Sequence, residues 1–248
     1  GEVFRQMRSH PPLTGGRAFD FRRVREIEST DKKLFSTDLA NPLGEIPVLT
    51  GASFNLWDPD FGKPYAYGTD EIRRHVLAKV LKSARASGSA FHGLRISGVS
   101  DLPIARARIM VRDVCRPTDS RTAIVCLVPP LVTGIEKAPY LLRRAGSERD
   151  EAYVLGILSS IPFDWFARRV VELSMTLEVL SSMPIPRAAE SDRRFRRVVE
   201  ISGALAARDE RYEAWATAVG VRAGSVISSA EREAMICELD ALAAHLYG

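Results

Sequence analysis

A short segment in the middle of the chain alternates between apolar and long polar side chains. Over Ile104–Val114, one set of alternate positions is apolar and the other is mainly arginine. The apolar set is Ala105, Ala107, Ile109 and Val111, and the other set is Arg106, Arg108, Met110 and Arg112. A period of two is typical of a β-strand with one face buried. The segment therefore predicts a half-buried strand whose outer face carries arginine side chains.

Other segments of the first part also predict strands. Thr122–Val128 is continuously apolar, which is typical of a central strand buried on both faces. Pro129 ends this run because proline cannot continue the hydrogen-bonded ladder. Ile46–Leu56 and Tyr140–Arg143 are further β-rich runs. We expect a polar loop at Arg116–Arg121, held between two strands.

Helical spacing of apolar residues dominates the second half of the chain. Asp70–Ala84 is the one clear helical pattern in the first part, and Glu151–Ser160 and Phe163–Leu173 begin the second. Met183–Arg187 contains two prolines and is expected to be an extended linker. We predict an α+β fold, with a β-rich domain over residues 1–187 and a helical C-terminal segment over residues 188–248.

The last predicted helix has the clearest boundaries. Ser228 and Glu231 have the spacing of a capping box, in which a serine side chain accepts a hydrogen bond from the first helical turn. Apolar residues recur at three- and four-residue steps from Met235 to Leu246. Phe163, Trp165, Phe195 and Trp215 lie on similar stripes and are expected in the core. Trp57 lies beside a polar turn, where it could contact either the core or a ligand.

Charge and cysteine content narrow the class of protein. The 248 residues carry a formal net charge of +4, and arginine outnumbers acidic residues in Gly1–Lys33, Ile104–Arg121 and Arg187–Arg197. A basic surface favours a polyanionic partner, although ordinary solvated faces would give the same pattern. The three cysteines form no Cys-x-x-Cys pair, which favours a reduced, cytoplasmic protein. No apolar run approaches the roughly 20 residues of a membrane span, so no membrane partner is expected.

Motifs of enzymatic chemistry are sparse in the sequence. The four histidines are scattered without metal-ligand spacing, and no glycine-rich phosphate loop is present. Asp58, Asp60 and Lys63 could serve a magnesium-dependent nuclease, but Asp58–Gly62 is also typical of a turn. We therefore assign no catalytic residue and no metal site.

The arginine-bearing strand and the loop after it are the candidate binding site. Arginine pairs with phosphate or with guanine, and aspartate accepts a hydrogen bond from cytosine. We expect Asp119 and Arg121 to contact base edges and the other residues to contact phosphates. A solvated strand face and a polar hairpin without any partner would show the same composition. The candidate DNA-binding residues are Lys63, Arg106, Arg108, Arg112, Arg116, Asp119, Arg121 and Thr122.

Four groups of residues, in order along the chain, carry a resemblance to a known family. The first is Pro47–Trp57 with Asp58. The second is Ile109–Asp113 with Thr118–Thr122 and Val128-Pro-Pro130. The third is Leu155–Ser160 with Phe163-Asp-Trp165 and Arg168, and the fourth is Met183-Pro-Ile-Pro186. Together they resemble the target-recognition and C-terminal region of adenine-specific (N6) DNA methyltransferases of the fused restriction–modification or phage-defence type.

The resemblance implies a role in reading double-stranded DNA. A recognition domain would hold the duplex while a neighbouring catalytic domain extrudes an adenine, with S-adenosylmethionine as cofactor of the parent protein. The residues Arg112, Arg121 and Thr122 match the family pattern and could equally brace the loop through buried hydrogen bonds.

The catalytic half of that family has no counterpart in this sequence. The Pro-Pro pairs in His10–Leu13 and Val128–Leu131 lack the flanking residues that bind a flipped adenine. We expect this chain alone to be inactive, with the methyltransferase domain in the same polypeptide or in a partner subunit. Two other functions are compatible with the sequence: a helical protein-interaction module of a defence complex, and a magnesium-dependent nuclease fragment.

Overall fold

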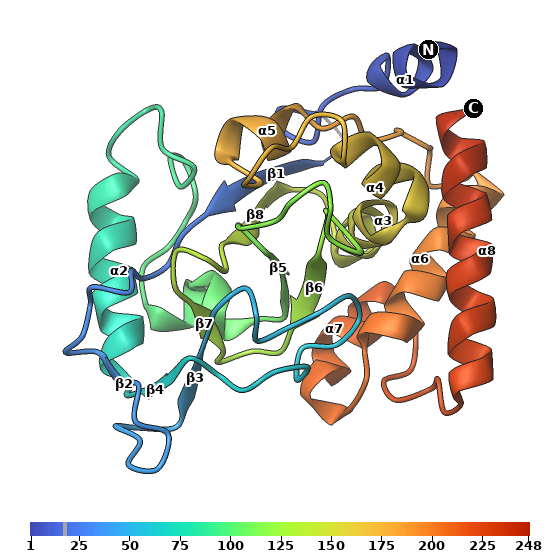
Figure 1. The fold of residues 1–248 in the computed structure, drawn as a ribbon. Coiled ribbons are helices and arrows are strands. Elements are labelled where there is room, and N and C mark those ends of the chain that lie inside the picture. Colours follow the sequence, from blue (N-terminus) through green and yellow to red (C-terminus); the bar gives the residue numbers. More distant parts are fainter. Residues whose placement is uncertain (17–18) are drawn as a thin grey trace.

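Two four-stranded β-sheets organise the fold (Figure 1). The computed structural model describes residues 1–16 and 19–248. The first sheet is antiparallel and has the strand order β1-β8-β5-β6. Its strands are β1 (Asp20–Val24), β8 (Tyr140–Ala145), β5 (Arg108–Val111) and β6 (Val125–Val128).

The second sheet is smaller and mixed. It has the order β2-β4-β3-β7, in which β3 and β7 run parallel and the other pairs are antiparallel. Its strands are β2 (Phe35–Ser36), β4 (Ala66–Gly68), β3 (Ile46–Leu49) and β7 (Thr133–Gly134).

The helices pack around these sheets (Figure 1). The long C-terminal helices lie on one side of the first sheet, and one long helix lies on the other side. The helices are α1 (Glu2–Arg8), α2 (Glu71–Ser83), α3 (Glu148–Ser159), α4 (Ile161–Ala167), α5 (Leu177–Ser182), α6 (Arg193–Ala206), α7 (Glu213–Val219) and α8 (Ser229–Tyr247). Short 3-10 turns are η1 (Val99–Asp101), η2 (Pro103–Ala105) and η3 (Glu210–Tyr212).

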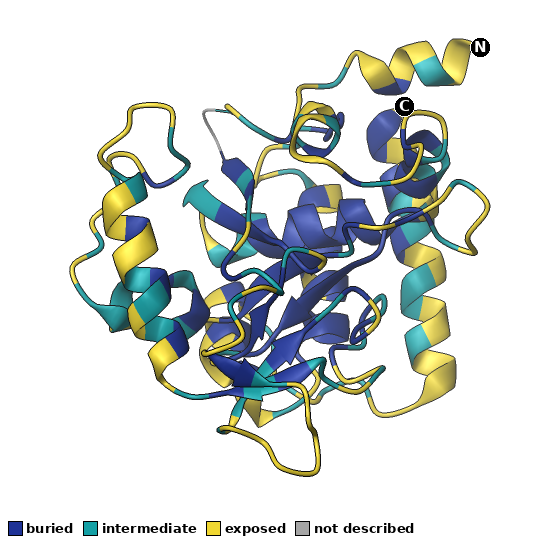
Figure 2. Cartoon of the chain, turned by 60° about the vertical axis from the view of Figure 1, so that its left-hand side comes forward, coloured by how far each residue is buried: buried dark blue, intermediate teal, exposed yellow. Residues whose placement is uncertain are grey.

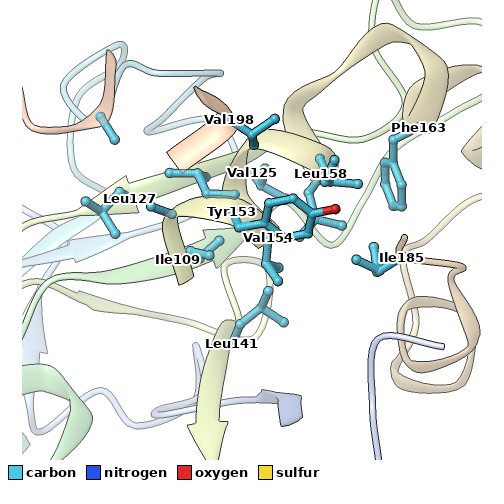
Figure 3. Close-up of a cluster of buried hydrophobic side chains, with 14 of the residues drawn as sticks. Ile109, Val125, Leu127, Leu141, Tyr153, Val154, Leu158, Phe163, Ile185 and Val198 are labelled. Atoms are coloured by element: carbon cyan, nitrogen blue, oxygen red, sulfur yellow. The ribbon is translucent and has the colours of Figure 1, made fainter. Parts of the chain in front are cut away.

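One buried cluster joins the first sheet to the C-terminal helices. Ile109 and Leu141 from the strands pack against Tyr153 and Val154 of α3, and Val198 of α6 extends the same cluster (Figure 3). The core therefore continues across the boundary expected at residue 187, and the C-terminal helices pack onto the first sheet through α3.

A second buried cluster covers the opposite face of the first sheet. Met110 and Tyr140 point away from α3 and join Ile72 and Val76 of α2 and Val48 of β3. As a result β5 and β6 are buried along their whole length (Figure 2). The apolar run Thr122–Val128 predicts a central strand, but β6 is the edge strand of this sheet and is buried because the two clusters cover both of its faces. β5 is therefore buried on both faces, whereas its sequence pattern predicts a strand with one exposed face.

The predicted α+β class, with a helical C-terminal segment, is confirmed. The strand expected over Ile104–Val114 is shorter, because Pro103–Ala105 forms a 3-10 turn and β5 starts at Arg108. At the start of α8, the Ser228 side chain accepts a hydrogen bond from the Glu231 backbone at 3.1 Å, as the capping pattern predicts. Among the described residues, no helix is both long and apolar enough to cross a bilayer.

Candidate nucleic-acid interface

The eight candidate DNA-binding residues do not share one solvent face. Lys63, Arg106, Arg116 and Asp119 are exposed, whereas Arg108 and Thr122 are buried and Arg112 and Arg121 are partly buried. Arg106 precedes β5 and Arg116 follows it, so the strand, about 13 Å long at 3.3 Å per residue, lies between them. The expected arginine-lined strand face is therefore not present.

Arg108 is an internal side chain and cannot contact DNA. It is 3% exposed, and its Nη2 donates to Glu26 Oε2 at 2.5 Å and to the Val132 carbonyl at 2.8 Å. The guanidinium also lies 5.0 Å from the centre of the Tyr140 ring. The sequence pattern was misleading here because the face of β5 that carries Arg108 is covered by the second cluster.

Arg112 holds two loops together. Its Nε donates to the Gly51 carbonyl at 2.6 Å, and its Nη2 donates to the Phe54 carbonyl at 2.8 Å. The next residue, Asp113, donates its backbone N–H to the Lys137 carbonyl at 3.1 Å. Burial lowers the pKa of Arg112 from its usual value. These bonds place residues 50–63, 112–121 and 135–138 side by side.

Asp164 of α4 is the centre of the network that fixes the polar loop. Its Oδ1 accepts the backbone N–H groups of Thr122 and Ala123, each at 2.7 Å. Its Oδ2 accepts from Arg168 Nε at 2.9 Å, and Arg121 Nε lies 3.7 Å from Oδ1. A carboxylate that accepts several charge-assisted bonds holds its donors strongly.

Arg168 also holds the polar loop, because its guanidinium donates hydrogen bonds to three backbone carbonyls. Its Nη1 donates to the Pro117 carbonyl at 2.6 Å, and its Nη2 donates to the carbonyls of Asp119 and Ser120 at 2.8 and 2.6 Å. The Thr122 hydroxyl donates to the Arg116 carbonyl at 3.1 Å. The backbone of residues 116–122 is thus held by side chains that lie beneath it.

The residues that match the family pattern are therefore mainly structural. Arg121 donates to the Ser159 carbonyl and lies beside Asp164, while Arg112 and Thr122 bond to neighbouring loops. Of the two roles open to these three residues, the geometry supports bracing. Burial lowers the pKa of Arg121, with the Asp164 carboxylate opposing this shift.

Four exposed charged side chains of the three adjoining loops, three of them basic, are here called the loop surface. It consists of Lys63, Arg116, Asp119 and Lys137. Asp119 Oδ2 accepts the backbone N–H of Arg116 at 3.0 Å, which fixes the carboxylate beside the cation. The sequence patterns described above do not include Lys137. Its position in a short turn between two β-rich runs is the feature that would have suggested an exposed lysine here.

The acidic turn belongs to a different contact. Asp58 forms an ion pair with Arg208, and Asp60 forms one with Arg211 at 2.5 Å. Both carboxylates thus attach the turn to the C-terminal helical region. Across residues 1–16 and 19–248, no cluster of three or more His, Cys, Asp or Glu side chains has the geometry to hold a metal.

The aromatic residues expected in the core occupy it. Phe163, Phe195 and Trp215 are buried, and Trp165 is partly buried against the same cluster. Trp57 is 4% exposed and joins this cluster too, which excludes it from the loop surface.

Comparison with known proteins adds no family to this description. The sequence matches no protein-family model, and no curated protein matches it. The resemblance to adenine methyltransferases thus stays a prediction that depends on the quoted residues.

Proposed function

We propose that this chain is the DNA target-recognition part of a restriction–modification or related defence adenine methyltransferase. It would position duplex DNA for a catalytic domain in the same polypeptide or in a partner subunit. The parent protein would use S-adenosylmethionine and would act in the cytoplasm, where three unpaired thiols are stable.

The observation that carries the proposal is the braced polar loop after β5. Arg168 and Asp164 bind the loop backbone, so the exposed side chains of Arg116, Thr118 and Asp119 project from a fixed frame. A preorganised loop loses little conformational entropy when it enters a DNA groove. The residues that make this frame are those that carry the family resemblance.

The loop surface suggests a division of roles. Lys63, Arg116 and Lys137 would contact phosphates, because flexible exposed cations bind the backbone without sequence preference. Asp119 would accept a hydrogen bond from a cytosine amine in the major groove. Arg121 is reassigned from base reading to bracing, since its guanidinium is engaged with Ser159 and Asp164.

The two alternative functions have less support from the contacts. The acids of the nuclease hypothesis are paired with Arg208 and Arg211. For the interaction-module hypothesis, the buried stripe of α8, including Leu239 and Ala243, packs against the chain's own core.

Binding of duplex DNA across a salt series tests the proposal. We expect affinity to fall steeply with added salt, and we expect Arg116→Ala and Lys137→Ala each to reduce the slope of log K against log salt by about 1. Lys82→Ala, which removes an exposed cation from α2, is the matched control and should leave the slope unchanged. Salt-independent binding, or equal slopes in all variants, would exclude phosphate contacts at the loop surface.

A further inference from the structure

A cavity of about 310 Å³ lies where β5 and β8 separate. The two strands pair at Met110 and Tyr140, and their residues nearer the other end, 107–108 and 141–143, form opposite walls. Helices α3 and α7 close the space. Its volume is at the lower end of the range for small-molecule sites. The apolar part of the wall comprises Ala107, Pro130, Leu141, Leu142, Trp215 and Ala218.

Glu151 of α3 provides a carboxylate in this wall. The residue is 3% exposed, and Trp215 Nε1 donates to its Oε2 at 2.9 Å. Burial raises the pKa of Glu151 to about 7, with attraction from Arg143 and Arg108 working in the opposite direction. A buried carboxylate with few donors is costly, so a ligand N–H group would stabilise it.

Arg108 also lines the cavity, but its side chain is almost entirely buried in the wall. Its Nη2 is engaged, but Nε and Nη1 have no hydrogen-bond partner within the described part of the chain. A buried guanidinium with two unpartnered N–H groups is rare in folded proteins. Because these two nitrogen atoms are inaccessible to solvent, Arg108 contributes positive charge to the wall, and the Glu151 carboxylate is the wall group that can accept a hydrogen bond from a ring amine.

Arginines outnumber the carboxylates of Asp101, Glu148 and Glu151 among the residues that line the cavity. Arg143 is paired with Glu148, and Arg211 is paired with Asp60. Arg95 and Arg106 are exposed, and among residues 1–16 and 19–248 neither has an ion-pair partner within 4.0 Å. An anionic group at the rim would meet two cations that no carboxylate neutralises by direct contact.

We propose that this cavity binds a nucleotide, with the base between the apolar walls and the phosphate at Arg95 and Arg106. The ring amine would donate to the carboxylate of Glu151. The nucleotide is either free or part of a DNA strand, since both share this chemistry. The inference stands apart from the proposed function, because the loop surface lies at the opposite end of β5.

Calorimetric titration of the whole chain with AMP, GMP, CMP and UMP tests the site. We expect at least one of AMP, GMP and CMP, whose rings carry an amine, to bind, and to bind about tenfold more weakly after Arg106→Ala, as for loss of a charge-assisted hydrogen bond. Ala218→Phe places a ring at the cavity from an exposed helix position and should abolish binding. Arg8→Ala removes an exposed arginine from α1 and should have no effect.

A second titration uses a single-stranded hexanucleotide. If the ligand is part of a DNA strand, the hexanucleotide binds in place of the mononucleotides, and Ala218→Phe removes that binding. Circular dichroism confirms that each variant is folded. The proposal is overturned if neither probe binds at millimolar concentration, or if binding is the same in Ala218→Phe and Arg106→Ala as in the unmodified chain.

Discussion

Replacing Asp164 with alanine tests whether the loop is held from beneath. The substitution leaves the buried N–H groups of Thr122 and Ala123 without an acceptor, at about 1–3 kcal/mol each. It also removes the anion beside Arg168 and Arg121. Because these losses overlap, we expect a total of about 3–5 kcal/mol, typical of breaking a buried charged contact.

Thermal unfolding and amide hydrogen exchange measure this effect. For a chain of this size each kcal/mol lowers Tm by about 2–4 °C, so Asp164→Ala should lower it by about 6–20 °C. Amides of residues 113–123 should exchange faster, and binding should weaken for all DNA sequences alike. Asp119→Ala, which removes an exposed carboxylate of the same loop, should change Tm by less than about 2 °C.

Two results would contradict the bracing role of Asp164. One is a Tm for Asp164→Ala within about 2 °C of the unmodified chain. The other is unchanged exchange at residues 113–123 despite a lower Tm, which would show that Asp164 stabilises the fold elsewhere.

Three further predictions concern the core. The pKa of Glu151 is raised to about 7, so the native state retains a proton that the unfolded chain loses, and stability falls as pH rises from about 4.5 to 7. Glu151→Gln should remove this pH-dependent loss of stability, which is worth about 3 kcal/mol. Its Tm, measured from pH 5 to 8, should therefore vary less with pH than that of the unmodified chain. A Tm profile identical to that of the unmodified chain would refute the raised pKa of Glu151. Gly156→Ala should lower the free energy of unfolding in urea by about 1–3 kcal/mol, because the added Cβ would clash with Ser202 Oγ between α3 and α6. Adding Ser202→Ala to this variant should restore part of the lost stability. Iodoacetamide at pH 8 should add one group by intact mass, at exposed Cys237, since the other two thiols are buried with raised pKa; two or three adducts would contradict this burial.

Local sequence patterns were sufficient for much of the secondary structure. The helical spacing of Asp70–Ala84 corresponds to α2, and the serine cap of α8 forms as its spacing predicts. The apolar run Thr122–Val128 contains β6. These features depend on neighbours a few residues away, so periodicity and capping chemistry predict them.

The environment of the arginines was decided by the tertiary structure. Arg108 is buried because Glu26 lies beneath it, and Arg112 is engaged because the backbone of Gly51 and Phe54 reaches it. A guanidinium leaves water only where acceptors replace its hydration, and here they come from segments 24 to 82 residues away in the sequence. An alternating strand pattern cannot report whether its polar face will be covered by such distant partners.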